Sequence, residues 1–447
     1  MSFTASIVIV FIIGYLFIAL ESFTKVNKAA VALLMFVVCW VLYMCGVNAG
    51  AFPIESGDGS AAGFVNGRLM EQIGETAETL FFLMGAMTIV EIVDSKGGFD
   101  FVIKYLRTRS KRALLWRISG ITFVLSAILD NLTTSIVMVM ILRKLVKNKK
   151  DRLIYAAMVI VAANAGGAPS PIGDVTTIML WIAGNITTLG VLKEVLIPAV
   201  VSIVVPVLIV QMSMRGSLPA AEEAVEEQRA LQFTPVERKA VFGIGVGGLI
   251  FVPIFRAMTD LPPFVGILLV LGVLWTVTEV FYRSKTNIPS SMKQRVSKLL
   301  SRIDMTTILF FLGILLAVGA MSEIGVLQSF GKWLEGVSGG NDYLVTGVIG
   351  VVSSIVDNVP LVAGAMKMYV IDPTSVNLAV DGIFWQLLAY CAGVGGSMLI
   401  IGSAAGVVVM GLEKITFGWY LRHISWIVLV GYLAGMVTYW LLRTFVF

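Results

Sequence analysis

Oxygen-bearing side chains gather at three aspartates, each of which stands inside a long apolar stretch. Asp130 and Asp357 are each followed by asparagine, and Asp174 lies in the glycine- and proline-rich stretch GGAPSPIGDVTT. Carboxylate, amide and hydroxyl oxygens are hard donors, suited to a small alkali cation and not to a transition metal. The further candidate ligands near these three carboxylates are Asn131, Thr133, Thr134, Asn164, Ser170, Thr176, Thr177, Asn358, Ser397 and Ser403.

A carboxylate in such a setting can exchange one cation for another. Burial favours its protonated form, whereas a bound cation favours its ionised form, so a proton and Na⁺ compete for it. We expect Na⁺ to bind at Asp130, Asn131, Asn164, Asp174 and Thr177. Glu78 is a candidate proton relay, although an interfacial or structural ion pair explains it equally well. No catalytic residue and no cofactor are expected.

The composition places these residues in a membrane protein. Of 447 residues, 57% are hydrophobic and 14% are charged, and the mean hydropathy is +0.91. Because soluble domains carry about 25% charged residues, this composition excludes a soluble enzyme, a nucleic-acid-binding protein and a disordered scaffold. The single histidine and three cysteines form no zinc or disulfide pattern. The apolar N-terminus is interpreted as a first span and not as a signal peptide.

Hydropathy predicts ten crossings, since a helical span needs about 20 apolar residues. Two of them are too long for one plain helix, contain glycine clusters and are predicted to be broken helices. The polar stretch 214–238, with Glu222, Glu223, Glu226 and Glu227, is predicted to be a linker with five crossings on each side. The crossings are 4–20, 29–47, 78–95, 153–190 (broken), 193–213, 239–256, 263–282, 305–323, 383–413 (broken) and 424–444.

The distribution of charge predicts which loops face the cytoplasm. Basic clusters lie around Lys25 and Lys28, from Arg107 to Arg117, from Arg143 to Arg152 and from Arg283 to Arg302. All of these fall on one side of the predicted topology, which should therefore be cytoplasmic. Acidic loops around Glu55 and Asp58, and around Asp372 and Asp381, fall on the other side.

Two further apolar segments are predicted to be re-entrant hairpins. Segment 113–142 has basic residues at both ends but is too short for two crossings, which need about 40 residues. It should enter from the cytoplasm and turn at Asp130 and Asn131. Segment 343–371 has acidic flanks and should enter from the outside and turn at Asp357 and Asn358. Backbone exposed at such tips is tolerated where it is buried in protein or faces a water-filled cavity.

The two halves of the chain share motifs at nearly one spacing. Leu80–Leu83 recurs at 309–312, the Asp-Asn pair recurs 227 residues later, and Gly166, Gly167 and Gly173 recur 229 residues later. Because each half has an odd number of crossings, the second half should be inverted, as in many secondary transporters. We therefore expect one repeat over 1–213, a cytoplasmic linker over 214–238 and a second repeat over 239–447.

The order of these motifs resembles the NhaD-type sodium/proton antiporters of the ion transporter superfamily. The resemblance runs from about residue 75 to 445 and is most specific in DNLTTSIVM and PIGDVTT. It implies exchange of Na⁺ or Li⁺ for H⁺ in a bacterial inner membrane, by a homodimer with two hairpins. In related anion symporters the hairpin tips resemble Ser-Asn-Thr, whereas here they carry Asp130 and Asp357. This difference favours a small monovalent cation as the substrate.

Two alternatives remain open. A Na⁺-coupled dicarboxylate symporter or a metalloid oxyanion exporter would use half-helix N-termini and basic residues such as arginine at the membrane midplane, and the sequence offers no such arginine. An intramembrane aspartyl protease is a second alternative, since Ile172, Gly173 and Asp174 resemble a Gly-Asp catalytic motif with Asp130 as its partner. A protease has no need of an inverted second copy.

Overall fold

The computed structural model describes residues 2–53, 60–214, 216–218, 233–283 and 296–446. The described chain is helical throughout, and eight of its helices are long and apolar enough to cross a membrane. It is therefore a multi-pass membrane protein. The predicted loop residues Glu55 and Asp58, and the four glutamates of the predicted linker, lie outside the described residues.

One set of helices, called here the α3–α14 group, packs through long contacts. Within it α14 lies along α3, α1 lies against α3, and α12 packs against α4 and α11. A Cβ atom added at Gly313 would lie 2.6 Å from the carbonyl carbon of Ala32, so only glycine lets α14 approach α3 this closely. The group comprises α1 (Phe3–Ala19), α3 (Lys28–Asn48), α4 (Ala61–Ser95), α11 (Pro235–Thr259), α12 (Pro263–Arg283) and α14 (Met305–Glu323).

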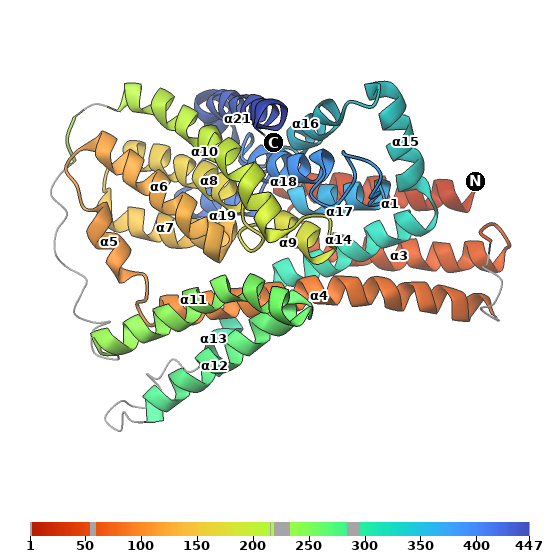
Figure 1. Ribbon diagram of the computed structural model, residues 1–447, viewed down its shortest axis with the longest axis horizontal. Coiled ribbons are helices and arrows are strands. Elements are labelled where there is room, and N and C mark those ends of the chain that lie inside the picture. Colours follow the sequence, from red (N-terminus) through yellow and green to blue (C-terminus); the bar gives the residue numbers. More distant parts are fainter. Residues whose placement is uncertain (1, 54–59, 215, 219–232, 284–295, 447) are drawn as a thin grey trace.

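The helices on either side of the interruptions, together with α10 and α21, form a second set, called here the hairpin group. Its closest contacts join α10 to α21, α6 to α8 and α16 to α18. In Figure 1, α6, α8, α10 and α21 lie above α4, α11 and α12, which run along the lower edge of the view. The group comprises α6 (Lys111–Leu129), α7 (Asn131–Leu145), α8 (Lys149–Gly167), α9 (Val175–Ile182), α10 (Thr188–Ser213), α16 (Asp342–Ser353), α17 (Asn358–Met368), α18 (Ile383–Gly395), α19 (Ala404–Glu413) and α21 (Trp426–Phe445).

Short helices connect these elements. They are α2 (Glu21–Thr24), α5 (Asp100–Leu106), α13 (Val296–Leu299), α15 (Val326–Ser338) and α20 (Phe417–Tyr420). A 3₁₀ turn over Leu300–Arg302 precedes α14, and a π-helical segment over Leu421–Ser425 leads into α21.

Helix boundaries fall at both predicted hairpin tips. Helix α6 ends at Leu129 and α7 begins at Asn131, so Asp130 alone makes the turn, with a φ of 97°. With a ψ of 157°, this backbone conformation lies in a region that is otherwise essentially restricted to glycine. In the second hairpin α16 ends at Ser353 and α17 begins at Asn358. The faces from which the two hairpins enter remain a prediction.

Both long crossings are interrupted where glycine clusters occur. Helix α8 ends at Gly167 and α9 begins at Val175, while α18 ends at Gly395 and α19 begins at Ala404. The chain between α8 and α9 contains two prolines, which cannot supply the backbone N–H that a continuous helix needs. Each break therefore leaves a helix end inside the protein.

Equivalent contacts attach each broken crossing to the hairpin of its own half. The hydroxyl of Ser126 on α6 donates to the carbonyl of Ala163 at 2.6 Å, and that of Ser353 on α16 donates to the carbonyl of Ala392 at 3.1 Å. Ser353 follows Ser126 by 227 residues and Ala392 follows Ala163 by 229, the spacings of the sequence motifs. These contacts support an internal repeat, while the division at 213 and 239 and the inverted sense remain predictions.

Candidate functional site

Four half-helices begin at the interruptions, and each begins with a residue singled out from the sequence. Asp130, Asp174, Asp357 and Ser403 are the N-caps of α7, α9, α17 and α19, and each side chain accepts a backbone N–H of the first turn. An N-cap side chain satisfies a donor that the helix leaves unpaired. The partial positive charge of a helix N-terminus also stabilises an anionic side chain.

These N-termini meet at one pocket. Its polar lining contains Asp130, Asn131, Asp174, Asp357 and Asn358, and its volume with the open mouth is about 480 Å³. The three carboxylates and both asparagines of the hairpin tips, which are far apart in the sequence, therefore face the same space.

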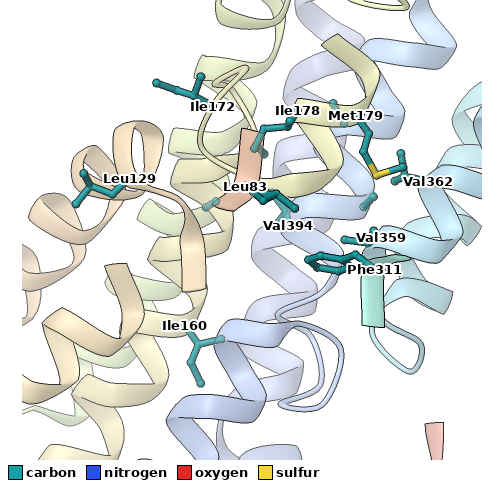
Figure 2. Packing of buried hydrophobic residues seen from close by; sticks show 14 of the residues in the cluster. Leu83, Leu129, Ile160, Ile172, Ile178, Met179, Phe311, Val359, Val362 and Val394 are labelled. Carbon is teal, nitrogen blue, oxygen red and sulfur yellow. The ribbon is translucent and has the colours of Figure 1, made fainter. Parts of the chain in front are cut away.

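Apolar side chains surround this polar pocket. Leu83 of α4, Phe311 of α14 and Val359 of α17 line it, and Figure 2 shows these three close to one another. Leu129 and Ile172, which are near Asp130 and Asp174 in the sequence, are also buried. Charges in such apolar surroundings interact more strongly than they would in solution.

A chain of side-chain hydrogen bonds joins three of the interruptions. The amide nitrogen of Asn131 lies 2.7 Å from a carboxylate oxygen of Asp174 and 3.1 Å from the amide oxygen of Asn164. The amide nitrogen of Asn164 in turn donates to the hydroxyl of Ser403 at 2.9 Å. Asn131, Asn164, Asp174 and Ser403 are all buried. The first hairpin tip, both parts of the first broken crossing and the start of α19 therefore hold one another in place.

The three carboxylates differ in their partners. Asp130 accepts hydrogen bonds from the backbone and hydroxyl of Thr133, both at 2.8 Å. Asp174 accepts from the backbone and hydroxyl of Thr176, both at 3.0 Å, besides the bond from Asn131. These partners are uncharged. Asp357, in contrast, forms an ion pair of 2.9 Å with Lys28 of α3.

Three other predicted ligands, Ser170, Thr177 and Ser397, are buried, but they stabilise the interruptions and do not line the pocket. The hydroxyl of Thr177 donates to the carbonyl of Ala168, and that of Ser397 donates to the carbonyl of Val394. The hydroxyl of Ser170 accepts the backbone N–H of Ile172. The hydroxyl of Thr177 is thus directed to its own helix break, and its part in Na⁺ binding stays a prediction.

Two buried polar atoms at the tips have no hydrogen-bond partner within the described protein. They are the hydroxyl of Thr134 and the amide nitrogen of Asn358. Asn358 lines the pocket and Thr134 does not. Since buried polar groups are normally hydrogen-bonded, the amide of Asn358 is suited to bind water or an oxygen of a ligand in the pocket.

Glu78 lies outside the pocket lining, half-buried on α4. Nearby on α11, Arg256 donates a hydrogen bond of 2.5 Å to the carbonyl of Trp181 at the end of α9. The proposed relay through Glu78 therefore stays a prediction. Among the described residues, no three His, Cys, Asp or Glu side chains are close enough to share a metal ion.

Two residues near the carboxylates were missed by the sequence analysis. Thr307 of α14 lines the pocket, and Lys28 pairs with Asp357. From the sequence, Lys28 belongs to a basic loop, because the residues around it give no sign of a contact with Asp357. Asp357 therefore differs from Asp130 and Asp174 in having a cationic partner.

Comparison with known proteins identifies the family. The citrate transporter family (CitMHS) matches residues 15–386, which is most of the chain. The chain belongs to this family. It is therefore a membrane transporter and not an enzyme, and the alternative of an intramembrane protease is excluded.

Several proteins similar to this chain are named for the exchange of sodium and protons. Sodium/proton antiporter 1 of Arabidopsis thaliana is 45% identical over 96% of this chain and 71% of its own length. Sodium/proton antiporter 2 of the same plant is 40% identical over 98% of this chain and 99% of its own length. The Na(+)/H(+) antiporter NhaD of Vibrio cholerae is 28% identical over 97% of this chain and 91% of its own length. The resemblance to NhaD-type antiporters is thus confirmed.

A solved structure shows the same fold. The YdaH transporter of Alcanivorax borkumensis, described as having an unusual topology, superposes with a TM-score of 0.60 over 93% of this chain and 98% of its own. The sequence identity is 14%, so this likeness concerns the fold alone.

Proposed function

We propose that this transporter exchanges Na⁺ or Li⁺ for H⁺, with the two kinds of ion competing for the carboxylates of Asp130 and Asp174. The names of the plant and bacterial relatives support sodium and protons as the substrates. The geometry supports Asp130 and Asp174 as the competing groups because both line the pocket and both accept only uncharged donors in the described structure.

The observation that carries this proposal is the presence of aspartates as N-caps in the pocket. An uncapped half-helix N-terminus attracts an anionic substrate. Here the carboxylates of Asp130, Asp174 and Asp357 already occupy that place on three of the half-helices. An anion would meet these negative charges, whereas a cation or a proton would neutralise them.

Transport of citrate or another carboxylate is the second candidate, because it is the description of the family. In such a transporter the substrate would supply the negative charge at the helix N-termini, and the carboxylates of the chain would have to be protonated or paired with cations. This candidate predicts Na⁺ uptake that depends on the organic anion, which exchange with protons does not require.

The remaining features of the proposal concern topology and assembly. The two halves form an inverted repeat that brings Asp130, Asp174 and Asp357 together near the middle of the bilayer, with the linker on the cytoplasmic side. A proton bound at the site leaves when Na⁺ binds, and the loaded site then becomes accessible from the other face. We further propose that the protein is a homodimer. In a bacterial cell it would lie in the inner membrane.

The test uses inside-out membrane vesicles from cells that lack other sodium/proton exchangers. After respiration has acidified the vesicle interior, added Na⁺ or Li⁺ should dissipate the pH gradient, with K⁺ added for comparison. In Asp130→Asn and Asp174→Asn the loss of a charged ligand, worth about 1.5–3 kcal/mol, should weaken Na⁺ binding about tenfold or more.

Asp260→Asn is the matched control. Asp260 is exposed in the turn between α11 and α12 and also has a positive φ, of 54°. The Asp260→Asn variant should exchange Na⁺ for H⁺ at the rate of the wild type. Full exchange by both Asp130→Asn and Asp174→Asn would refute competition at these carboxylates. Uptake of Na⁺ into proteoliposomes only when citrate or succinate is present would favour the second candidate.

A further inference from the structure

We infer that Lys28 is an intramolecular counter-ion that locks the hairpin group when the pocket carries neither a proton nor a transported cation, and so prevents the empty transporter from changing its orientation. This inference rests on the proposed exchange of Na⁺ for H⁺. It assigns to Lys28 a positioning role, exerted through Asp357, that makes the exchange obligatory.

The ion pair joins the two groups of helices at the pocket itself. Lys28 begins α3 in the α3–α14 group, whereas Asp357 caps α17 in the hairpin group and lines the pocket with Asp130 and Asp174. The ammonium nitrogen lies 2.9 Å from a carboxylate oxygen of Asp357, and the two side chains are 19% and 10% exposed. A partly buried pair of this geometry is screened less by salt than a pair at the surface.

Lys28 is held on the α3–α14 group independently of Asp357. Its backbone N–H donates to the carboxylate of Glu21, and its ammonium lies 4.2 Å from the centre of the Phe310 ring on α14. A cation above an aromatic ring is stabilised by the charge distribution of the ring. If the second hairpin moves away, the ammonium therefore keeps a partner, whereas Asp357 loses its cation.

This difference between Lys28 and Asp357 links movement of the hairpin group to the binding of an ion in the pocket. Separating a partly buried ion pair leaves an uncompensated carboxylate, which is costly. The cost falls when Asp357 or the neighbouring carboxylates of the pocket take up a proton or a monovalent cation, because the negative charge is then already neutralised. When the pocket is empty, Asp357 therefore stays paired with Lys28. When the pocket holds a proton or a cation, the ion pair can separate.

Two other polar contacts between the described parts of the groups lack this property. Lys367 of α17 pairs with Glu75 of α4, and Glu75 is 55% exposed at its side chain. Arg256 of α11 bonds the carbonyl of Trp181, which carries no charge and cannot be neutralised by a transported ion. Neither Lys367 nor Arg256 lines the pocket. The pair of Lys28 with Asp357 differs from both contacts, because its carboxylate belongs to the pocket and can be neutralised by the ions bound there.

The experiment measures coupling in proteoliposomes of the full-length protein loaded with ²²Na⁺ and a pH-sensitive dye. The membrane potential is clamped with K⁺ and valinomycin, and protons gained per Na⁺ released are recorded. Wild type should give a constant ratio. In Lys28→Met the ratio should fall, about twofold if empty and proton-loaded sites return at equal rates. Asp357→Asn should lower the ratio in the same way, and Lys28→Arg should retain it.

Lys25→Met is the matched control, because Lys25 is exposed in the same connection between α2 and α3. It should keep the wild-type ratio, as should any variant that affects only folding, since misfolded protein lowers both fluxes together. A wild-type ratio in both Lys28→Met and Asp357→Asn would overturn the role of Lys28. If the wild type itself releases Na⁺ without gaining protons, the proposed exchange fails instead, so the two failures are distinguishable.

Discussion

The side-chain amide of Asn131 lies 2.7 Å from a carboxylate oxygen of Asp174, although the two residues belong to different interruptions of the fold. The same amide nitrogen also donates to the amide oxygen of Asn164, so Asn131 orients both the carboxylate of Asp174 and the amide of Asn164. The position of Asp174 in the pocket therefore depends on the tip of the first hairpin.

Replacement of Asn131 should weaken the cation site without removing a charge. In Asn131→Ala, Asp174 loses a positioning hydrogen bond, and losses of this kind usually reduce ion affinity about 10–100-fold. The apparent KM for Na⁺ in the vesicle assay should therefore rise, with less change in the maximal rate. Asn148→Ala removes an asparagine that caps α8 at an exposed position, and its KM for Na⁺ should equal that of the wild type. An unchanged KM in Asn131→Ala would contradict the positioning role.

Alanine at the glycines of the broken crossings should destabilise the protein. A Cβ atom at Gly173 would lie 2.7 Å from the carbonyl oxygen of Ser126, and one at Gly402 would lie 2.5 Å from that of Ser354. These neighbours are backbone atoms that cannot turn aside, so each change should cost about 1–3 kcal/mol and lower the Tm in detergent. Gly120→Ala on α6, where no other atom lies within 4 Å, should not lower it. Equal Tm values for all three variants would argue against tight packing at the breaks.

Single cysteines can test the inverted sense of the two halves. The native cysteines Cys39, Cys45 and Cys391 are first replaced by alanine. Asn148→Cys, beyond the first hairpin, and Thr374→Cys, beyond the second, then place a thiol at exposed positions. A membrane-impermeant maleimide should label them from opposite faces of oriented vesicles, Asn148→Cys from the cytoplasmic face. Labelling of both from one face would refute the inverted repeat.

Removal of one charge should disrupt a double ion pair at the end of α19. The carboxylate of Glu413 is fully buried and lies 2.6 Å from the Nε of Arg143 and 2.7 Å from that of Arg152. Glu413→Gln leaves two arginines without an anion, which should cost about 1–3 kcal/mol and lower the Tm. Glu335→Gln, at an exposed position of α15, should leave the Tm within experimental error. An unchanged Tm in Glu413→Gln would show that these pairs contribute little.

The sequence alone determined where the helices are interrupted. The Asp-Asn pairs, glycine clusters and prolines act on their own backbone, so the breaks at Asp130 and before Val175 followed from local chemistry. The predicted spans likewise lie close to the observed helices, because twenty apolar residues have few alternatives in a membrane. The largest difference is at α4, which begins at Ala61 and not at residue 78. Its first turns contain charged residues that hydropathy does not assign to a span.

Only the tertiary structure decided which of the predicted ligands face one another. Lys28 and Asp357 are 329 residues apart, and no local pattern could pair them. Thr177 and Ser397 are in the predicted motifs, yet their hydroxyls serve their own helix breaks, whereas Asn131 reaches Asp174 across the fold. Composition and local geometry establish that a residue is buried and polar. Its partner depends on how distant helices pack, and that partner determines whether a carboxylate is free to bind an ion.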